Sequence, residues 1–264
     1  MLPFMGLTAM IRNLGNMSRV EAIKPLSEYE DIVIERLNEK EIKKARVHPF
    51  SILLALKTYQ SGKGFRGTNT WPVSNRVVDA LDKAFYLAFQ NVVPSGKRFF
   101  IGQDVSGSMS SPFGGTNLSC SEASAAMALV TMATEPKCYI GAFCDRMKMI
   151  DISPRMRLDD VTRKISNMTF GGTDCALPMI YALEKGIEAD VFLVLTDNET
   201  WTGRIHPVKA LQDYRRKTGI NAKLIVVGMT ATNFSIADQS DGGMLDIVGF
   251  DASGPAVISE FARQ

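Results

Sequence analysis

Two uninterrupted apolar runs constrain the fold of this chain more than any other feature. VFLVL occupies 191–195 and is followed by Thr196 and Asp197, and LIVV occupies 224–227 and is followed by Gly228. Neither run alternates apolar with polar residues, so neither predicts a strand with one face in water. Such runs are typical of strands that are buried on both faces of a parallel sheet. The sequence therefore predicts an α/β fold with helices on both faces of the sheet.

Strand and helix signals alternate along the rest of residues 96–264, which extends this prediction to a whole domain. Apolar segments predict two more strands over 97–104 and 137–144, and shorter ones are expected over 148–153 and 244–250. Helices are expected over 119–134, 157–168, 174–186, 206–219 and 254–263.

The first 95 residues carry a different pattern, with no strand signal. Apolar residues recur at helical spacing, for example at Phe4, Leu7 and Met10, and the segment predicts three or four helices, one of them over 29–45. We therefore expect two parts, a short all-α segment over 1–95 and an α/β domain over 96–264.

The two parts also differ in charge. Residues 1–98 contain 15 lysines and arginines against 9 aspartates and glutamates, whereas residues 99–264 contain 15 against 19. A basic segment could face a polyanion, or it could be a solvated helical surface. Charge alone does not separate these two explanations.

Other features exclude several classes of protein. No apolar stretch approaches the roughly 18 residues of a membrane-spanning helix, and the N-terminal residues lack the basic segment and cleavage site of a secretory signal. The cysteines have no metal-binding spacing and predict reduced thiols: Cys120, Cys138, Cys144 and Cys175. We expect a cytoplasmic protein, or also a nuclear one in a eukaryote, with no membrane partner.

Three loops expected at one edge of the sheet carry hydroxyl and carboxylate side chains: Asp104, Ser106, Ser108, Thr173, Asp174 and Asp197. Ligands of open parallel sheets bind outside the carboxyl ends of the strands, where these loops should meet. Hydroxyl and carboxylate oxygens suit Mg²⁺ or Mn²⁺ better than Ca²⁺ when carboxylates are few. No His or Cys is near, which argues against Zn²⁺.

Each loop also has a purely structural explanation, because Asp, Ser and Thr commonly form turns and cap helices. Thr173 and Asp174 could cap the helix that follows them, and Asp197 could form a turn only. The occurrence of three such loops, each at a strand end, favours a cation site.

The motifs DVSGSMS, GGTD and VFLVLTDNE resemble the metal-ion-dependent adhesion site of the von Willebrand factor A domain family, over roughly residues 97–264. The resemblance implies a Rossmann-like, mostly parallel sheet with helices on both faces. It also implies a divalent cation, with Mg²⁺ first and Mn²⁺ or Ca²⁺ as alternatives. By position, the metal-site residues would be Asp104, Ser106, Ser108, Thr173 and Asp197. In that family the sixth coordination position stays open for an acidic group of a partner.

Longer segments, among them KKARVHPFSILLALKTYQSGKGFRG, GGTDCALPMIYA and HPVKALQDYRRK, resemble the Ro (SS-A) ribonucleoprotein autoantigen family. That family joins a ring of HEAT-like helical repeats, the TROVE module, to a von Willebrand A domain. The resemblance implies binding of small noncoding Y-type RNAs or of the 3′ ends of misfolded RNAs, in RNA quality control. Residues 1–95 resemble only the last helices of the ring. A ring would therefore require several copies of this chain, as a homo-oligomer.

Candidate RNA contacts lie on both sides of the helix expected over 48–62: Lys43, Lys44, Arg46, Lys57, Lys63 and Arg66. Cations of this kind neutralise phosphates, and Phe65 and Trp71 could stack on exposed bases. The same segments also fit a solvated loop. His48, which precedes Pro49, fits a structural helix start.

Three functions remain for comparison. The first is a Ro-like RNA-binding protein without catalysis, and the second is a protein-binding domain whose metal accepts a partner's Glu or Asp. The third is a Mg²⁺-dependent, phosphatase-like enzyme with Asp104 as nucleophile. Such an enzyme would need a second acid two residues further on, where Ser106 stands. The sequence therefore predicts a protein that is not an enzyme.

Overall fold

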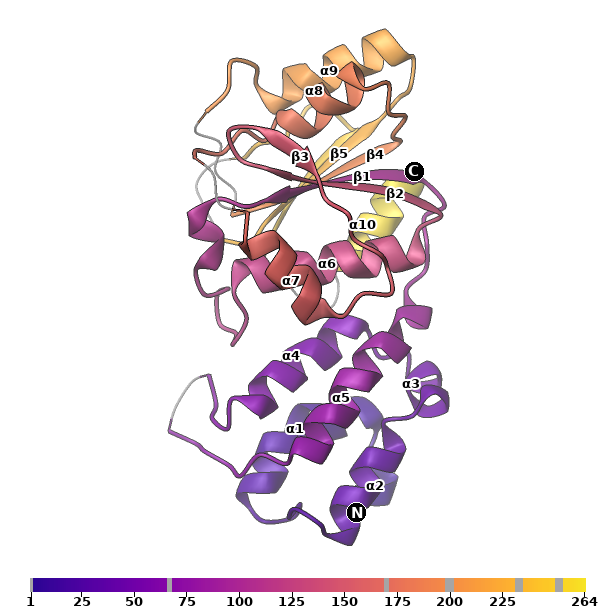
Figure 1. The fold of residues 1–264 in the computed structure, drawn as a ribbon. Coiled ribbons are helices and arrows are strands. Elements are labelled where there is room, and N and C mark those ends of the chain that lie inside the picture. Colours follow the sequence, from indigo (N-terminus) through magenta and orange to yellow (C-terminus); the bar gives the residue numbers. More distant parts are fainter. Residues whose placement is uncertain (1, 66–67, 169–170, 198–201, 231–234, 250–253) are drawn as a thin grey trace. The chain divides into compact units, whose positions relative to one another are not determined.

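The computed structural model describes residues 2–65, 68–168, 171–197, 202–230, 235–249 and 254–264. The chain forms two compact units (Figure 1). The helical unit comprises Met1–Val93 and Gly115–Leu118, and the sheet unit comprises Pro94–Gly114 and Ser119–Gln264. Each unit is described by itself.

The described part of the helical unit contains five α-helices and two short 3-10 helices: η1 (Leu2–Phe4), α1 (Leu7–Arg19), α2 (Glu28–Arg36), α3 (Glu39–Ala45), α4 (Pro49–Gln60), α5 (Asn75–Leu87) and η2 (Ala88–Asn91). The expected number was three or four, and the difference arises at Asn38. The Asn38 side chain accepts a hydrogen bond from the Glu41 amide at 3.0 Å and caps a new helix. The segment 29–45, with one helical pattern, is therefore two helices.

Polar contacts in the interior tie these helices together. The Ser18 hydroxyl on α1 lies 3.2 Å from the Tyr59 hydroxyl on α4. Glu30 on α2 is completely buried, and it accepts hydrogen bonds from the Ser74 hydroxyl and from the Arg76 guanidinium, the latter at 2.7 Å. Because each buried polar group has a partner, the unit can bury them without a large desolvation cost.

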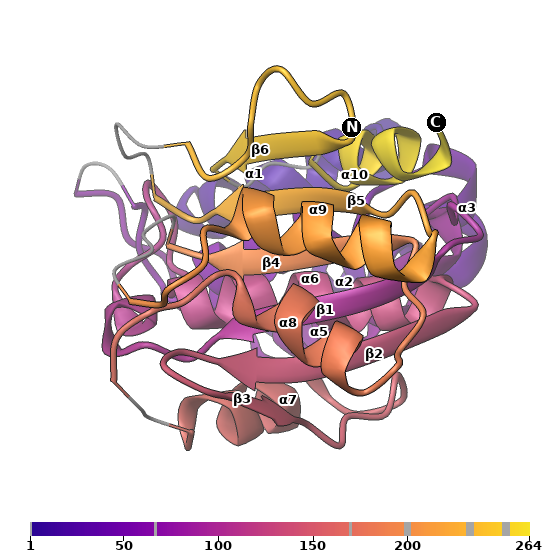
Figure 2. The same cartoon turned by 90° about the horizontal axis from the view of Figure 1, so that it is seen from above.

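The described residues of the sheet unit form six strands in the order β3-β2-β1-β4-β5-β6 (Figure 2). The strands are β1 (Arg98–Asp104), β2 (Lys137–Phe143), β3 (Met147–Met149), β4 (Val191–Thr196), β5 (Lys223–Gly228) and β6 (Met244–Val248). All neighbouring pairs are parallel except β2 with β3, which is antiparallel. The predicted α/β fold with a mostly parallel sheet is confirmed.

Helices cover both faces of this sheet, as the apolar strands predicted. The helices of the unit are η3 (Gly107–Ser110), α6 (Cys120–Thr134), α7 (Leu158–Ser166), α8 (Leu177–Glu184), α9 (Pro207–Thr218) and α10 (Gly254–Arg263). Figures 1 and 2 show α8 and α9 on one face and α6, α7 and α10 on the other. Alternate residues of β1 and β4, such as Phe100 and Phe192, join the core beneath α8 and α9.

Helix α8 begins three residues later than expected. We predicted a helix from Asp174, but Asp174 forms a turn in which its Oδ1 accepts a hydrogen bond from the Ala176 amide at 3.0 Å. Pro178 then occupies the first turn of the helix, where a missing amide hydrogen costs nothing.

The topology fixes where a ligand site can form. The chain leaves β1 toward β2 on one side of the sheet, and it leaves β4 toward β5 on the other. In open parallel sheets, the carboxyl ends of two such strands border a crevice that binds ligands. Strand β1 ends at Asp104, and β4 ends at Thr196, directly before Asp197.

The described helices include no apolar segment of the length that crossing a bilayer requires.

Candidate metal centre

Asp104 ends β1 at this edge of the sheet and is completely buried. Its Oδ2 accepts a hydrogen bond from the Thr196 hydroxyl at 2.7 Å, and its Oδ1 accepts one from the Ser106 amide at 2.8 Å. Burial raises the pKa of Asp104 to about 6, the two hydrogen bonds oppose this rise, and the charge of Asp197 adds to it. Asp104 is therefore oriented by hydroxyl and amide donors beside a second acid.

Ser106 and Ser108 are presented by a short 3-10 turn that follows β1. Their hydroxyl oxygens lie 3.0 Å apart, with Ser106 half-buried and Ser108 exposed. The turn is anchored by Met109, which is buried, and by Val105, whose amide donates to the Phe143 carbonyl at the end of β2. The alternation of DVSGS thus brings two hydroxyls together at the edge of the sheet.

Thr173 and Asp197 reach the same edge from the neighbouring strand ends. Thr173 is buried, and the amide of the next residue, Asp174, donates to the carbonyl of Cys144 beyond β2 at 2.7 Å. Asp197 is buried too, and its carbonyl accepts a hydrogen bond from the Thr230 hydroxyl at 2.6 Å. The sheet therefore places Thr173 beside the end of β2 and Asp197 at the end of β4.

The chemistry of these side chains fits a hard divalent cation. No ion pair within the described part of the chain neutralises Asp104 or Asp197, although both are buried. An uncompensated carboxylate in the interior is costly, and a cation removes that cost. Among the described residues, no group of three His, Cys, Asp or Glu side chains could hold a metal ion. A cation here would depend on the hydroxyls of Ser106, Ser108 and Thr173, which favours Mg²⁺ or Mn²⁺ over Zn²⁺.

The sequence analysis did not identify two residues that contact the site. Thr196 donates a hydrogen bond from its hydroxyl to Asp104, and the only sequence signal for this role is its position directly before Asp197. Gly203 lies against Asp174, and no local sequence pattern linked these two residues.

The candidate RNA contacts of the helical unit do not form one patch. Lys43 and Lys44 are exposed in the last turn of α3, and Arg46 follows in a left-handed cap, also exposed. Lys63 is exposed and Lys57 half-buried at the other end of α4. Lys57 lies in the last turn of α4, eight residues after Pro49 at its start, and Lys63 lies beyond its end. Roughly 12 Å or more of helix therefore separates the two groups. Arg66 lies outside the described residues.

The two aromatic residues considered for base stacking, Phe65 and Trp71, differ in their contacts. Phe65 is 48% exposed, as a base-stacking residue must be. Trp71 instead donates its indole N–H to the Tyr59 carbonyl at 2.9 Å. Its ring packs so closely on Gly15 that a Cβ there would lie 2.8 Å away. Trp71 therefore supports the loop that carries Phe65.

His48 has a structural role, in agreement with its interpretation from the sequence. Its Nδ1 accepts a hydrogen bond from the Phe50 amide at 3.2 Å and caps α4. Burial lowers the pKa of His48 to about 4, which keeps the ring neutral and able to accept this bond. His206 caps α9 in the same way, through the Val208 amide at 3.3 Å, but it is exposed.

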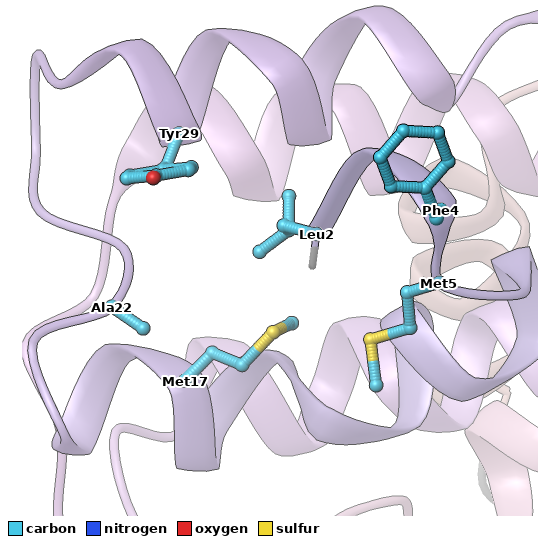
Figure 3. A pocket seen from close by; sticks show the side chains of 6 residues that line it. All are labelled: Leu2, Phe4, Met5, Met17, Ala22 and Tyr29. Atoms are coloured by element: carbon cyan, nitrogen blue, oxygen red, sulfur yellow. The ribbon is translucent and has the colours of Figure 1, made fainter.

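A hollow of about 810 Å³ in the helical unit was not expected from the sequence. It is lined mainly by apolar side chains: Leu2, Phe4, Met5, Met17, Ala22 and Tyr29 (Figure 3). None of these side chains is a cation, so the hollow does not suit phosphate.

Known proteins match both units of the chain. The Ro60 vWA domain model matches residues 98–262, and the TROVE domain model matches residues 2–61. RNA-binding protein RO60 of Deinococcus radiodurans is 46% identical over 262 residues, which cover 98% of this chain and 49% of that protein. RNA-binding protein RO60 of Caenorhabditis elegans is 42% identical over 259 residues, which cover 97% of this chain and 40% of that protein.

A solved structure agrees with this assignment. The crystal structure of Deinococcus radiodurans RO (RSR) protein has a TM-score of 0.93 to this chain at 45% identity, and the match covers 98% of this chain and 53% of that one. The chain spans half or less of the length of the curated relatives that it matches. With a Ro60 vWA domain preceded by TROVE-domain sequence, the chain belongs to the Ro60 family.

Proposed function

We propose that this chain is a noncatalytic, Ro-like RNA-binding protein whose sheet unit holds a divalent cation. The observation that carries the RNA-binding part is the likeness to two proteins named RNA-binding protein RO60, at 46% and 42% identity over almost the whole chain. The RNA would be a small noncoding RNA of the Y type or a misfolded RNA with a single-stranded 3′ end.

The exposed cations at the end of α3 are the best candidates for phosphate contacts. Lys43, Lys44 and Arg46 are all exposed, and no ion pair within the described residues occupies them. They also lie at the carboxyl end of a helix, where their charge is compatible with the helix dipole. Lys63 and the exposed Phe65 form a second, smaller group that could contact an unpaired base and its phosphate.

A gel-shift titration tests the RNA proposal, using a structured RNA with a free 3′ tail at several salt concentrations. Binding should weaken as salt rises, because phosphate neutralisation releases counterions. Replacement of Lys43, Lys44 and Arg46 by Gln should weaken binding and reduce the slope of log affinity against log salt by about 2.

The matched control removes the same charge from the sheet unit, by replacing the exposed Lys148, Lys185 and Lys217 with Gln. This variant should keep the affinity and the salt slope of the wild type. Absence of a shift at low salt, with tails of any length, would contradict the RNA proposal.

For the cation, we propose Mg²⁺ held by Ser106, Ser108 and Thr173 through their hydroxyls, with Asp104 and Asp197 as the acidic residues that balance its charge. When bound, the ion would supply a positive centre for an acidic group of a partner. The buried, hydrogen-bonded Asp104 supports this role better than a nucleophilic one, because Ser106 stands where a phosphatase would need an acid.

The exposure of Ser108 supports a second candidate function, a metal-dependent protein-binding module that does not bind RNA. The gel shift separates the two. An Asp104→Ala variant that still binds RNA, together with loss of binding in the Lys43, Lys44 and Arg46 variant, would place RNA recognition on the cations of the helical unit.

A further inference from the structure

Two loops at the carboxyl edge of the sheet hold one another through unusually close contacts. The Thr202 amide donates a hydrogen bond to the Thr173 carbonyl at 3.1 Å. The Thr202 methyl group fills the space above Gly172, where a Cβ would lie 2.5 Å from it. Gly172 and Thr173 therefore contact Thr202 both by a backbone hydrogen bond and by packing.

Gly203 makes the reciprocal contact. A Cβ at this position would lie 2.3 Å from Oδ2 and 2.5 Å from Cγ of Asp174, closer than real Cβ contacts allow. Gly203 also has φ +104°, a conformation that favours glycine. The Asp174 carboxyl group thus packs directly against the backbone at Gly203, and only glycine fits there.

Asp174 is itself held in place on both sides of this contact. Its amide donates to the Cys144 carbonyl at 2.7 Å, and its Oδ1 accepts from the Ala176 amide at 3.0 Å. Its exposed fraction is 7%. A side chain with its backbone and one oxygen already engaged is suited to hold a neighbour in position.

We propose that Asp174 and Gly203 are positioning residues of the metal site, which together hold Thr173 at the carboxyl edge of the sheet. The inference rests on the proposed metal site. Thr173 precedes Asp174 directly, and its carbonyl accepts the hydrogen bond from Thr202, the neighbour of Gly203. A displaced Asp174 therefore moves Thr173, one of the proposed metal-site residues.

The test is the affinity of the full chain for Mn²⁺ alone, measured by electron paramagnetic resonance on samples shown to be folded by circular dichroism. Gly203→Ala should raise the Kd for Mn²⁺ by about tenfold or more, as loss of an outer positioning contact does at other metal sites. Gly219→Ala is the matched control. Gly219 also has a positive φ, +72°, in the sheet unit, but nothing lies within 4 Å of its Cβ position, so the Mn²⁺ affinity should not change.

Two variants of Asp174 show whether the shape or the charge of its side chain affects Mn²⁺ binding. Asp174→Asn keeps the shape and should bind Mn²⁺ within about threefold of the wild type, whereas Asp174→Ala should weaken binding about as much as Gly203→Ala. The double variant of Asp174→Ala with Gly203→Ala should be no worse than either single change, because both break one contact.

Three outcomes would overturn the inference. If Gly203→Ala binds Mn²⁺ as the wild type does, or if Asp174→Asn loses as much affinity as Asp174→Ala, positioning by this contact is wrong while the metal site stands. If the wild type binds no Mn²⁺, the proposed metal site fails, and the positioning role fails with it.

Discussion

Among the described residues, each unit buries one carboxylate completely, and the two carboxylates have different partners. In the helical unit, Glu30 receives the Arg76 guanidinium at 2.7 Å, the Leu26 amide at 2.8 Å and the Ser74 hydroxyl. In the sheet unit, Asp104 receives hydrogen bonds from Thr196 and Ser106 but no cation among the described residues, and the neighbouring charge of Asp197 is also negative.

The presence or absence of a cationic partner distinguishes a carboxylate that stabilises the fold from one that belongs to a ligand site. A buried carboxylate with its own guanidinium contributes to folding by itself, whereas one without a cation is costly until an external ion arrives. We infer that Glu30 holds helices together and that Asp104 belongs to a site for a ligand. Both carboxylates are equally buried, so burial alone would not have distinguished them.

The largest expected effect is the pH dependence of the metal-free sheet unit. The folded pKa of Asp104 is about 6, above its usual value of 3.8, so the folded state binds the proton more tightly. The stability that this proton contributes is present at low pH and is lost as pH rises through about 6, a loss of about 3 kcal/mol. Asp104→Asn should remove this loss, as urea unfolding of the metal-free full chain between pH 4 and pH 7 can measure.

The control for that experiment is the wild type with Mg²⁺. Because the ion favours the ionised carboxylate, saturating Mg²⁺ should restore stability near neutral pH in the wild type but not in Asp104→Asn. A metal-free wild type whose stability does not fall between pH 4 and pH 7 would contradict the description of Asp104.

The next effect concerns the other carboxylate. Glu30→Gln keeps the shape of the side chain but removes the buried charge that pairs with Arg76, which keeps only its ion pair with the exposed Asp31 at 2.7 Å. The substitution should therefore destabilise the chain by about 2 kcal/mol. Arg76 is half-exposed, which keeps the cost below that of a fully buried pair. Urea unfolding with and without Mg²⁺ should give the same loss. If Mg²⁺ stabilises the Glu30→Gln variant by a different amount than it stabilises the wild type, the purely structural role of Glu30 would be contradicted.

The smallest effect involves the two histidine caps. The folded pKa of His48 is lowered to about 4, so the stability that its neutral ring contributes is present above about 6.5 and is lost as pH falls toward 4. Since His48 is half-buried, we expect a loss of about 1 kcal/mol.

His48→Asn keeps a capping side chain and should remove this acid-induced loss, while His206→Asn, at the exposed cap, should leave it unchanged. Hydrogen exchange of α4 and α9 amides between pH 4 and pH 7 would follow each helix separately. Equal effects of the two substitutions would show that burial of His48 is not the cause. Acid therefore should act on the two units with opposite signs, through His48 and through Asp104.

The sequence predicted the sheet well because its signals are local. The apolar runs at 191–195 and 224–227 became β4 and β5, and the helix stop at Gly219 lies where φ is +72°. The prediction of one helix over 29–45 was wrong, because the Asn38 side chain caps a second helix within that segment. Periodicity continues across such a break, so only the capping chemistry could have revealed it.

The candidate site shows the same limit. Asp104, Ser106 and Ser108 were visible because they alternate within one motif, and Thr173 and Asp197 because each follows a recognisable segment. The contact of Asp174 with Gly203 joins residues that are far apart in sequence, and no spacing rule contains it. The candidate RNA contacts were expected on both sides of a helix, and α4 does lie between Arg46 and Lys63.

Titration of Mg²⁺ into the wild type, Asp104→Asn and Glu30→Gln by isothermal calorimetry, near neutral pH, tests the central claim most directly. The wild type and Glu30→Gln should each bind one Mg²⁺ with the same affinity, and Asp104→Asn should bind none. Equal binding by Asp104→Asn, or no binding by the wild type, would contradict the assignment of Asp104 to a metal site.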